Sequence, residues 1–202
     1  MPQRRILDFT DHIPTPTQGR FLEDRTSRVK ALIGGLGSGK TRTGAEAFVD
    51  VVASNPGCRT LIVGPTHRMT RDLCLPAFEA ALPPELLRRH RKSEQLYDLV
   101  DGRIVHYGSA DTPAALEGLN VAGWWGDEIR YWPAESWQNL IARLRERRAR
   151  RLQAIVTTTP AMNWVADEFN AGKPGREVYR ISTRENAHNL ATGYIEDLRR
   201  SY

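Results

Sequence analysis

A glycine-rich segment at residues 34–41 has the residue types and spacing of a phosphate-binding loop. Its sequence, GGLGSGKT, matches the pattern GxxxxGK[ST] at every fixed position. The glycines let backbone N–H groups turn toward phosphate oxygens, and a helix that begins directly afterwards adds the positive end of its dipole. Lys40 is expected to reach the β- and γ-phosphates of ATP, and the Thr41 hydroxyl to bind Mg²⁺. The predicted phosphate-loop contacts are Gly34, Gly35, Gly37, Ser38, Gly39, Lys40 and Thr41.

Two adjacent acids, Asp127 and Glu128, end an apolar run with the sequence VAGWWGDE. Acids at a strand end are often merely exposed to solvent. This pair indicates a metal-binding and catalytic role because it follows a phosphate loop in the sequence. Asp127 is predicted to hold Mg²⁺, and Glu128 to be the general base that orients the attacking water. A buried strand and a hairpin separate the two motifs, and the second acid directly follows the first. Both features favour P-loop ATPases with an added strand and a catalytic glutamate over kinases that phosphorylate small molecules.

Two further signals are weaker. Thr157, Thr158 and Thr159 end another buried run and precede Pro160. Ligands of open α/β sheets bind at the carboxyl ends of strands, so we expect these hydroxyls, and Thr158 in particular, at the γ-phosphate. A β-branched strand end that stops at a proline explains the same residues without a ligand. Gln18 is predicted to read the edge of the adenine ring, with an exposed polar residue as the alternative.

The elements that must position these residues alternate between strands and helices. A hairpin is predicted around the Asp101-Gly102 turn. This alternation indicates a mainly parallel sheet with helices on both faces, the α/β fold of a P-loop NTPase of the catalytic-glutamate (ASCE-like) type. The predicted strands are 29–33, 60–63, 96–100, 103–107, 121–126, 154–158 and, at an edge, 177–181. The predicted helices are 18–25, 41–54, 67–82 (split by Pro76), 133–148, 163–170 and 192–200.

Composition narrows the class of protein. The 202 residues carry 29 Lys and Arg against 24 Asp and Glu, a formal charge of +5 that suits a nucleic-acid partner without requiring one. Cys58 and Cys74 form no CxxC pair, which argues against a disulfide framework or a cysteine zinc site. No apolar run approaches the ~18 residues of a membrane span, and the first residues do not resemble a secretory signal. We therefore expect a cytoplasmic protein with no membrane partner that is not secreted.

Two clusters of residue types leave their roles open. Six arginines fall within nine positions near residue 150, and they suit either a phosphate backbone, a neighbouring subunit or simply a solvated face. Arg145 and Arg148 are spaced to share one face of the predicted 133–148 helix. Four of the five tryptophans surround the second motif, where they suit packing or base stacking. The arginines are Arg143, Arg145, Arg147, Arg148, Arg150 and Arg151, and the tryptophans are Trp124, Trp125, Trp132 and Trp137.

The order of GGLGSGKT, VGPTH at residues 63–67, GWWGDE and TTTP resembles the ATPase domain of the terminase large subunit, the DNA-packaging motor of tailed bacteriophages and gene-transfer agents. The stretches TRTGAEAF, PAALEGLN and STRENAHNLATGYIEDLRRSY add to the resemblance, which runs from about Gln18 to the end. It implies a Mg²⁺-dependent ATPase that drives double-stranded viral DNA into a procapsid. It also implies adenine recognition by Gln18 and coupling of hydrolysis to DNA movement by residues 157–159.

The resemblance implies partners and a domain order as well. The partners are double-stranded DNA, the portal protein and procapsid, the small terminase subunit and further copies in a ring, usually a pentamer; a monomer in solution stays open. The location is the host bacterial cytoplasm, transiently at the procapsid portal. Residues 1–17 are expected to form an arm, 18–185 the ATPase domain, and 186–202 a helix leading toward a nuclease domain. Nothing in the sequence matches that nuclease, so we expect no DNA cleavage by this chain.

Two departures from the family pattern concern arginine. Leu36 stands where many members have arginine, and Glu117 stands where many have an arginine that acts on the neighbouring subunit's nucleotide. Another arginine could act on the nucleotide instead, and the candidates by position are Arg42, Arg68, Arg71 and Arg130. Two alternatives to the packaging motor stay open. One is a helicase-like DNA translocase, against which the lack of a second motor domain argues. The other, which these departures and the missing nuclease domain motivate, is a remnant that binds nucleotide or DNA without turnover.

Overall fold

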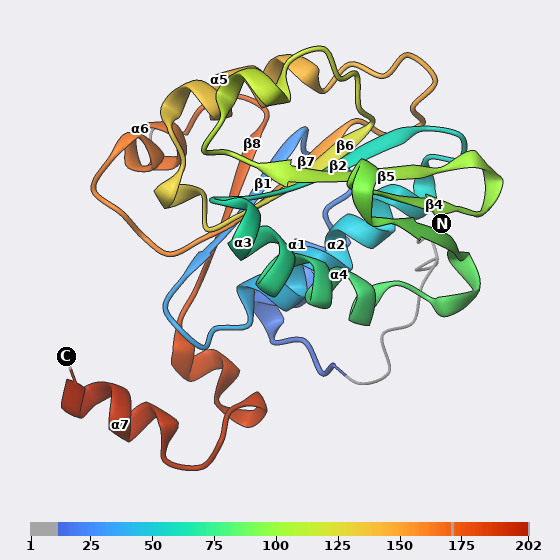
Figure 1. Cartoon of the computed structure of the whole chain (residues 1–202). Helices are drawn as coiled ribbons and strands as arrows, with labels where there is room; N and C mark the ends of the chain where they lie inside the picture. Colours follow the sequence, from blue (N-terminus) through green and yellow to red (C-terminus); the bar gives the residue numbers. More distant parts are fainter. Residues whose placement is uncertain (1–11, 171, 202) are drawn as a thin grey trace.

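The computed structural model describes residues 12–170 and 172–201. Its centre is an eight-stranded sheet with the order β3-β4-β5-β2-β6-β7-β1-β8, and helices cover both faces (Figure 1). The strands are β1 (Val29–Gly34), β2 (Arg59–Gly64), β3 (Leu87–Arg91), β4 (Leu96–Leu99), β5 (Ile104–Ser109), β6 (Gly123–Asp127), β7 (Gln153–Thr158) and β8 (Arg176–Ile181). The helices are α1 (Pro16–Glu23), α2 (Lys40–Ser54), α3 (His67–Met69), α4 (Leu75–Ala81), α5 (Ala134–Arg143), α6 (Trp164–Asn170) and α7 (Tyr194–Ser201). None of these helices is long and apolar enough to span a bilayer.

The central strands are parallel and buried on both sides. β1 pairs in parallel with β7 and β8, and β2 pairs in parallel with β5 and β6. Every residue of β1 and β7 is buried, including the polar Lys30, Gln153, Thr157 and Thr158, as is typical of central parallel strands. The strand that ends in Asp127 is separated from the strand before the phosphate loop by β7. A P-loop fold with an added strand, which the sequence favoured, has a strand in this position, and the α/β class is confirmed.

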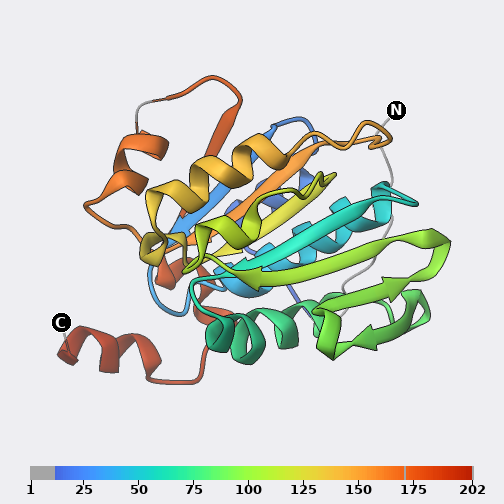
Figure 2. The ribbon, with the colours of Figure 1, turned by 45° about the horizontal axis from the view of Figure 1, so that its top comes forward.

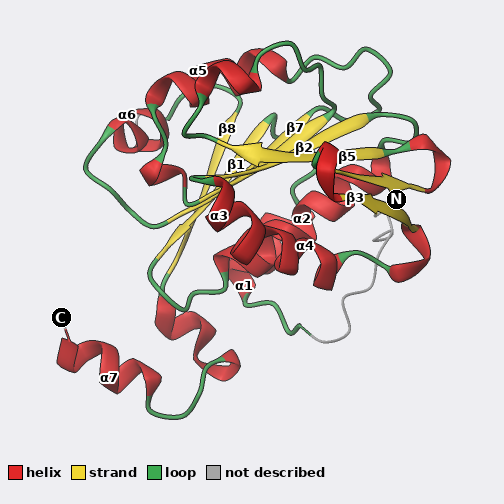
Figure 3. Cartoon of the chain, viewed as in Figure 1, coloured by secondary structure: helices red, strands yellow, loops and turns green. Residues whose placement is uncertain are grey.

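Alternate residues of each strand enter two different hydrophobic cores. Leu32 and Trp125 pack against α1, α2 and α4 on one face, whereas Ala31 and Trp124 pack against α5 and α6 on the other. Figure 3 shows the strands lying between these two helical layers. The tryptophans of the second motif, Trp124, Trp125, Trp132 and Trp137, are all at most 4% exposed, so they serve packing and not a base-stacking platform.

The antiparallel part of the sheet lies at one edge. β4 and β5 form the predicted hairpin, and its turn residues Asp101 and Gly102 have φ of 58° and 69°, as a type I′ turn requires. β3 adds a strand that the sequence analysis missed. Its sequence, LRRHR, is short and basic, and it lies at the outer edge, where charged side chains remain in water.

Three helix predictions need comment. The split at Pro76 is confirmed: a π-turn (Thr70–Cys74) precedes α4, and Pro76 falls in the first turn of α4, where its missing N–H costs nothing. The 133–148 helix is wrong beyond Arg143, because the buried Leu144 leaves the helix to form a bridge with Val121. Arg145 and Arg148 therefore lie in a loop and share no helix face.

The N-terminal arm is also shorter than predicted. α1 begins at Pro16, where Thr15 and Gln18 form a reciprocal capping box. Residues 1–11 of the predicted arm lie outside the described residues. At the other end, α7 stands apart from the sheet, as Figure 2 shows from a second angle.

Candidate nucleotide-binding site

The predicted phosphate loop connects the carboxyl end of β1 to the first turn of α2. Gly37 and Gly39 have φ of 73° and 78°, left-handed values that side chains other than glycine rarely adopt. Gly39 is also close to Gln18, since a Cβ atom there would lie 2.6 Å from the Gln18 amide nitrogen. The loop thus has the backbone shape that its glycines predict, at the N-terminus of a 15-residue helix.

Lys40 lies folded back onto the loop. Its Nζ donates to the Gly35 carbonyl at 2.8 Å and is 3.9 Å from Glu128 Oε1. Burial lowers the pKa of this lysine, while the charge of Glu128 opposes the shift. An anion in the loop would replace the Gly35 carbonyl as the partner of the ammonium.

Asp127 ends β6 beside the first turn of α2. Thr41 Oγ donates to its Oδ2 at 3.1 Å, and Thr157 Oγ donates to its Oδ1 at 2.5 Å. Burial raises the pKa of Asp127 to about 6; Glu128 also raises it, and the bonds from Thr157 and Thr41 lower it. One carboxylate and one hydroxyl are hard oxygen donors of the kind Mg²⁺ takes when phosphates and water supply the remaining ligands. The described residues contain no group of three or more His, Cys, Asp or Glu side chains that could hold a metal ion by themselves.

Glu128 has an unusual backbone and a well-defined side chain. Its φ of 44° is left-handed, a conformation that non-glycine residues adopt mainly where the surrounding structure imposes it. Thr159 donates to its carboxylate from both the backbone N–H, at 3.3 Å, and the hydroxyl, at 3.1 Å. The Arg130 guanidinium forms an ion pair with it at 3.1 Å, although the angle does not fit a hydrogen bond.

The three threonines have separate tasks. The Thr157 hydroxyl donates to Asp127, and the Thr159 hydroxyl donates to Glu128. The Thr158 hydroxyl instead accepts a hydrogen bond from the backbone N–H of Arg130 at 3.2 Å. The sequence analysis chose Thr158 for phosphate contact, which stays a prediction, and missed the direct bonds of its two neighbours to the acids. The pairing of Asp127 with Thr157 across β6 and β7 creates the first of these bonds.

Gln18 is fully buried, so the exposed alternative is wrong. Its Oε1 accepts the Thr15 N–H at 2.8 Å, and its Nε2 donates to the Ser38 carbonyl at 3.0 Å. Both ends of the amide therefore hold α1 against the phosphate loop. The predicted contact with adenine stays a prediction and would require exchange of these bonds.

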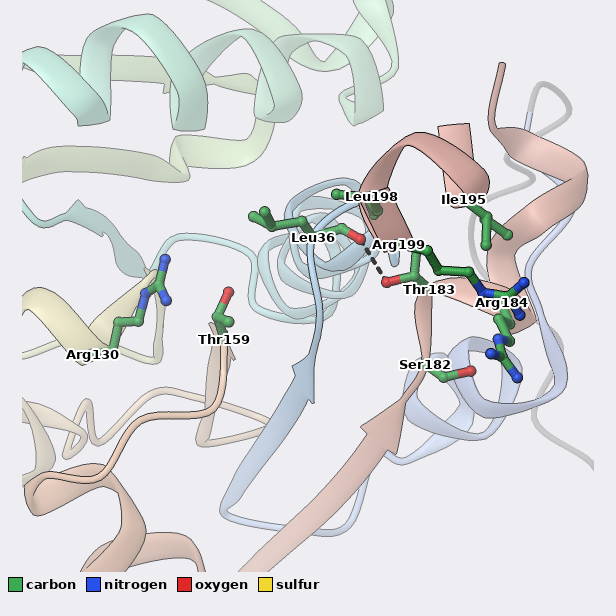
Figure 4. Close-up of a pocket in the computed structure, with 9 residues that line it drawn as sticks. All are labelled: Leu36, Arg130, Thr159, Ser182, Thr183, Arg184, Ile195, Leu198 and Arg199. Carbon is green, nitrogen blue, oxygen red and sulfur yellow. Dashed lines mark hydrogen bonds between the residues drawn. The ribbon is translucent and has the colours of Figure 1, made fainter. Parts of the chain in front are cut away.

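The candidate arginines differ in position. Arg130 alone of the four contacts one of the two acids; Arg42 pairs with Glu46 at 3.0 Å, and Arg71 with Asp72 at 2.7 Å. Arg68 also pairs with Asp72. A cleft of about 900 Å³ lies beside the loop, between Leu36, Arg130 and Thr159 on one side and side chains of residues 182–184 and α7 on the other (Figure 4). Residues 145–151 come just before the amino end of β7, and none of their arginines lines this cleft.

Fold and loop together define a P-loop NTPase. The sequence also matches the family model for the terminase large subunit, T4likevirus-type, N-terminal, over residues 31–202, and the chain belongs to that family. No curated protein matches the sequence.

Several solved structures also resemble this chain. The large terminase of a thermophilic bacteriophage matches with a TM-score of 0.78 and 13% identity, over 95% of this chain and 51% of its own. The same terminase in complex with ADP matches at 0.76 and 16%, over 94% and 50%. The large terminase ATPase domain of Thermus phage P74-26 matches at 0.69 and 17%, over 99% and 90%. The chain thus spans about half the length of the first terminase.

Proposed function

We propose that this chain binds ATP with Mg²⁺ and hydrolyses it, as the motor portion of a terminase large subunit that moves double-stranded DNA into a procapsid. The observation that carries the proposal is the convergence of two chain segments: Thr41 Oγ is 3.1 Å from Asp127 Oδ2, and Lys40 Nζ is 3.9 Å from Glu128 Oε1. The family membership and the ADP complex of a structural relative support it.

Each residue has a task in this mechanism. The N–H groups of the loop and the Lys40 ammonium bind the phosphates, and Thr41 and Asp127 hold the metal ion. When bound, Mg²⁺ neutralises charge on the β- and γ-phosphate oxygens. Glu128 orients the attacking water and accepts its proton, with its carboxylate positioned by Thr159. The Arg130 guanidinium forms an ion pair with the same carboxylate.

Coupling to DNA is proposed from the same contacts. Thr157 and Thr159 connect the end of β7 to the two acids, so a change at the γ-phosphate is transmitted to the strand and to the 160–163 turn that follows. Duplex DNA, the portal protein and procapsid, the small terminase subunit and a ring of copies are the partners expected of a packaging motor. The host cytoplasm, and transiently the procapsid portal, is the proposed location.

The decisive experiment compares ATP hydrolysis by the wild-type chain, Glu128→Gln and the control Glu135→Gln, an exposed acid on α5. Loss of the general base is expected to slow turnover by ~10²- to 10⁴-fold while nucleotide still binds. Glu135→Gln should turn over normally. Wild-type turnover by Glu128→Gln would contradict the assigned role, and no turnover by the wild-type chain at any concentration would favour the non-catalytic alternative.

Protein concentration and DNA structure separate the remaining possibilities. A specific rate that rises with protein concentration would show that neighbouring copies complete each other's sites, so that an arginine acts between subunits despite Glu117. A constant rate would show that each chain hydrolyses ATP alone. The arginine that supplies positive charge would then come from the same chain, and Arg130 is the candidate that contacts Glu128. Strand separation on a forked duplex would favour the helicase-like alternative.

A further inference from the structure

Side chains hold the backbone carbonyls of the phosphate loop by hydrogen bonds. All five carbonyls from Gly35 to Gly39 accept at least one side-chain hydrogen bond. The donors are Ser38 Oγ (2.7 Å) and Lys40 Nζ (2.8 Å) to Gly35, Thr183 Oγ (2.7 Å) to Leu36, Asn186 Nδ2 (2.8 Å) to Gly37, Gln18 Nε2 (3.0 Å) to Ser38, and Thr43 Oγ (3.0 Å) to Gly39. Figure 4 shows the Thr183 bond.

This pattern has a consequence for phosphate binding. Each peptide unit is planar and carries its C=O and N–H on opposite sides. Holding the carbonyls of residues 35–39 in fixed directions therefore restricts where the following N–H groups point. A loop that is held in its binding shape loses less conformational entropy when an anion enters, so its affinity is higher.

Two of these donors come from the far end of the chain. Thr183 and Asn186 belong to a single 3₁₀ segment, residues 183–189, that follows β8. Asn186 is 4% exposed, and Asn189 Nδ2 donates to its Oδ1 at 2.8 Å, which turns the Asn186 NH₂ group toward Gly37. Tyr194 lies against the same glycine, since a Cβ atom on Gly37 would be 2.7 Å from its ring.

The 183–189 segment is also attached to the start of the chain. Glu185 Oε1 accepts the Thr17 N–H at 2.9 Å, on the helix whose Gln18 bonds Ser38. The loop is thus held between α1 and the 183–189 segment, neither of which carries a sequence signal for phosphate.

We propose that the 183–189 segment regulates the nucleotide site, with Thr183 and Asn186 as positioning residues that hold the phosphate loop in its high-affinity shape. This inference rests on the proposed function for the identity of the ligand, a nucleoside triphosphate. Movement of the segment away from the loop lowers affinity, and by thermodynamic linkage bound nucleotide stabilises the segment in place.

The test measures MgATP affinity by calorimetry for the wild-type chain, Thr183→Val, Asn186→Ala and the double variant. Each single change removes one donor and is expected to weaken binding by ~3- to 10-fold, and the double variant by more than tenfold. At saturating MgATP, kcat should stay within ~3-fold, because neither side chain contacts the acids. Thr183→Ser keeps the hydroxyl and should bind like the wild-type chain. The exposed Thr192→Val, matched in chemistry and near in sequence, should do the same.

A second readout separates positioning from general structural damage. In the wild-type chain, MgATP should slow backbone hydrogen exchange across residues 183–189, and the double variant should lose this protection while its circular dichroism is unchanged. Unchanged affinity in a folded double variant would overturn the inference while leaving the proposed function intact. A wild-type chain that fails to bind MgATP would instead overturn the proposed function, and this inference with it.

Discussion

Charged and polar residues are arranged very differently at the two ends of the central strands. The carboxyl ends form what we call the carboxyl edge, and the amino ends form the amino edge. At the carboxyl edge, β1, β6 and β7 end in the phosphate loop, the two acids and the threonines, and these groups bond to one another across strands. At the amino edge, the same part of the sheet is lined by exposed arginines, among them Arg28, Arg59 and the 145–150 loop. Several of their contacts are to backbone or neutral groups: Arg28 donates to the Leu144 carbonyl, and Arg145 to Asn120.

Residues of the carboxyl edge are fixed in relation to each other by hydrogen bonds, whereas residues of the amino edge mainly share a surface. Burial and the charge of Glu146 raise the pKa of the Cys58 thiol, whereas Arg148, Arg103 and Arg150 oppose the shift, so these basic groups of the amino edge do gather in one place. Their more buried members, however, make contacts that stabilise the fold. Asp50 bridges Arg25 and Arg151, each at 2.8 Å, and buried Lys30 donates to the carbonyls of Phe21 and Asp24. We therefore expect changes at the amino edge to alter folding or surface binding, and changes at the carboxyl edge to alter turnover.

The largest expected effect concerns Lys30, which is 1% exposed. Burial lowers its pKa to about 7, whereas an unfolded lysine titrates near ~10.4. Between these values the unfolded chain binds more protons, so the free energy of unfolding should rise with pH from 7 toward 10, by ~3 kcal/mol. Urea unfolding at several pH values should show this rise in the wild-type chain and in the exposed-lysine control Lys92→Met, but not in Lys30→Met. Parallel pH curves for Lys30→Met and the wild-type chain would contradict the assignment.

A smaller effect is expected from Thr157→Val at the carboxyl edge. The change removes the hydroxyl that donates to Asp127 and accepts from the Trp125 indole. Loss of an outer partner of a metal-binding carboxylate typically costs 10- to 100-fold, so we expect ATP turnover to fall by ~10- to 100-fold. The matched control is Thr60→Val, a buried hydroxyl at the amino end of β2 whose loss should leave turnover unchanged. Equal effects of the two changes would show that the edges do not differ as described. Thr157→Ser should restore most of the activity.

The smallest effect is expected at the exposed arginines of the amino edge. Arg147→Ala and Arg150→Ala should leave ATP turnover without DNA within ~2-fold of wild type, because neither residue lines the cleft beside the phosphate loop. If this edge contacts duplex DNA, each change should weaken binding by a few-fold and reduce the salt slope by ~1. Fluorescence anisotropy with a labelled duplex at increasing salt measures both quantities. A tenfold loss of DNA-free turnover in either variant would show that the two edges are not independent.

The sequence predicts some features of this chain better than others: the phosphate loop and the order of the elements were predictable, and the end of α5 was not. The backbone shape of the phosphate loop was predictable because it depends on eight consecutive residues and follows largely from their glycines. The strand and helix order followed from apolar periodicity, which depends on local sequence. The end of α5 at Arg143 was missed because Leu144 pairs with Val121, a contact 23 positions away that outweighs the helical pattern.

The sequence by itself therefore determined the fold class, the phosphate loop with Lys40 and Thr41, and the two acids that end β6. Only the tertiary structure decided which groups meet around them. Thr157 reaches Asp127 because β7 lies beside β6 in one particular register. Thr183 and Asn186 reach the loop because the segment after β8, the neighbour of β1, passes beside the residues that follow β1. Their side chains are polar residues of ordinary appearance, and their role arises from strand neighbours and register, which depend on the packing of the whole chain.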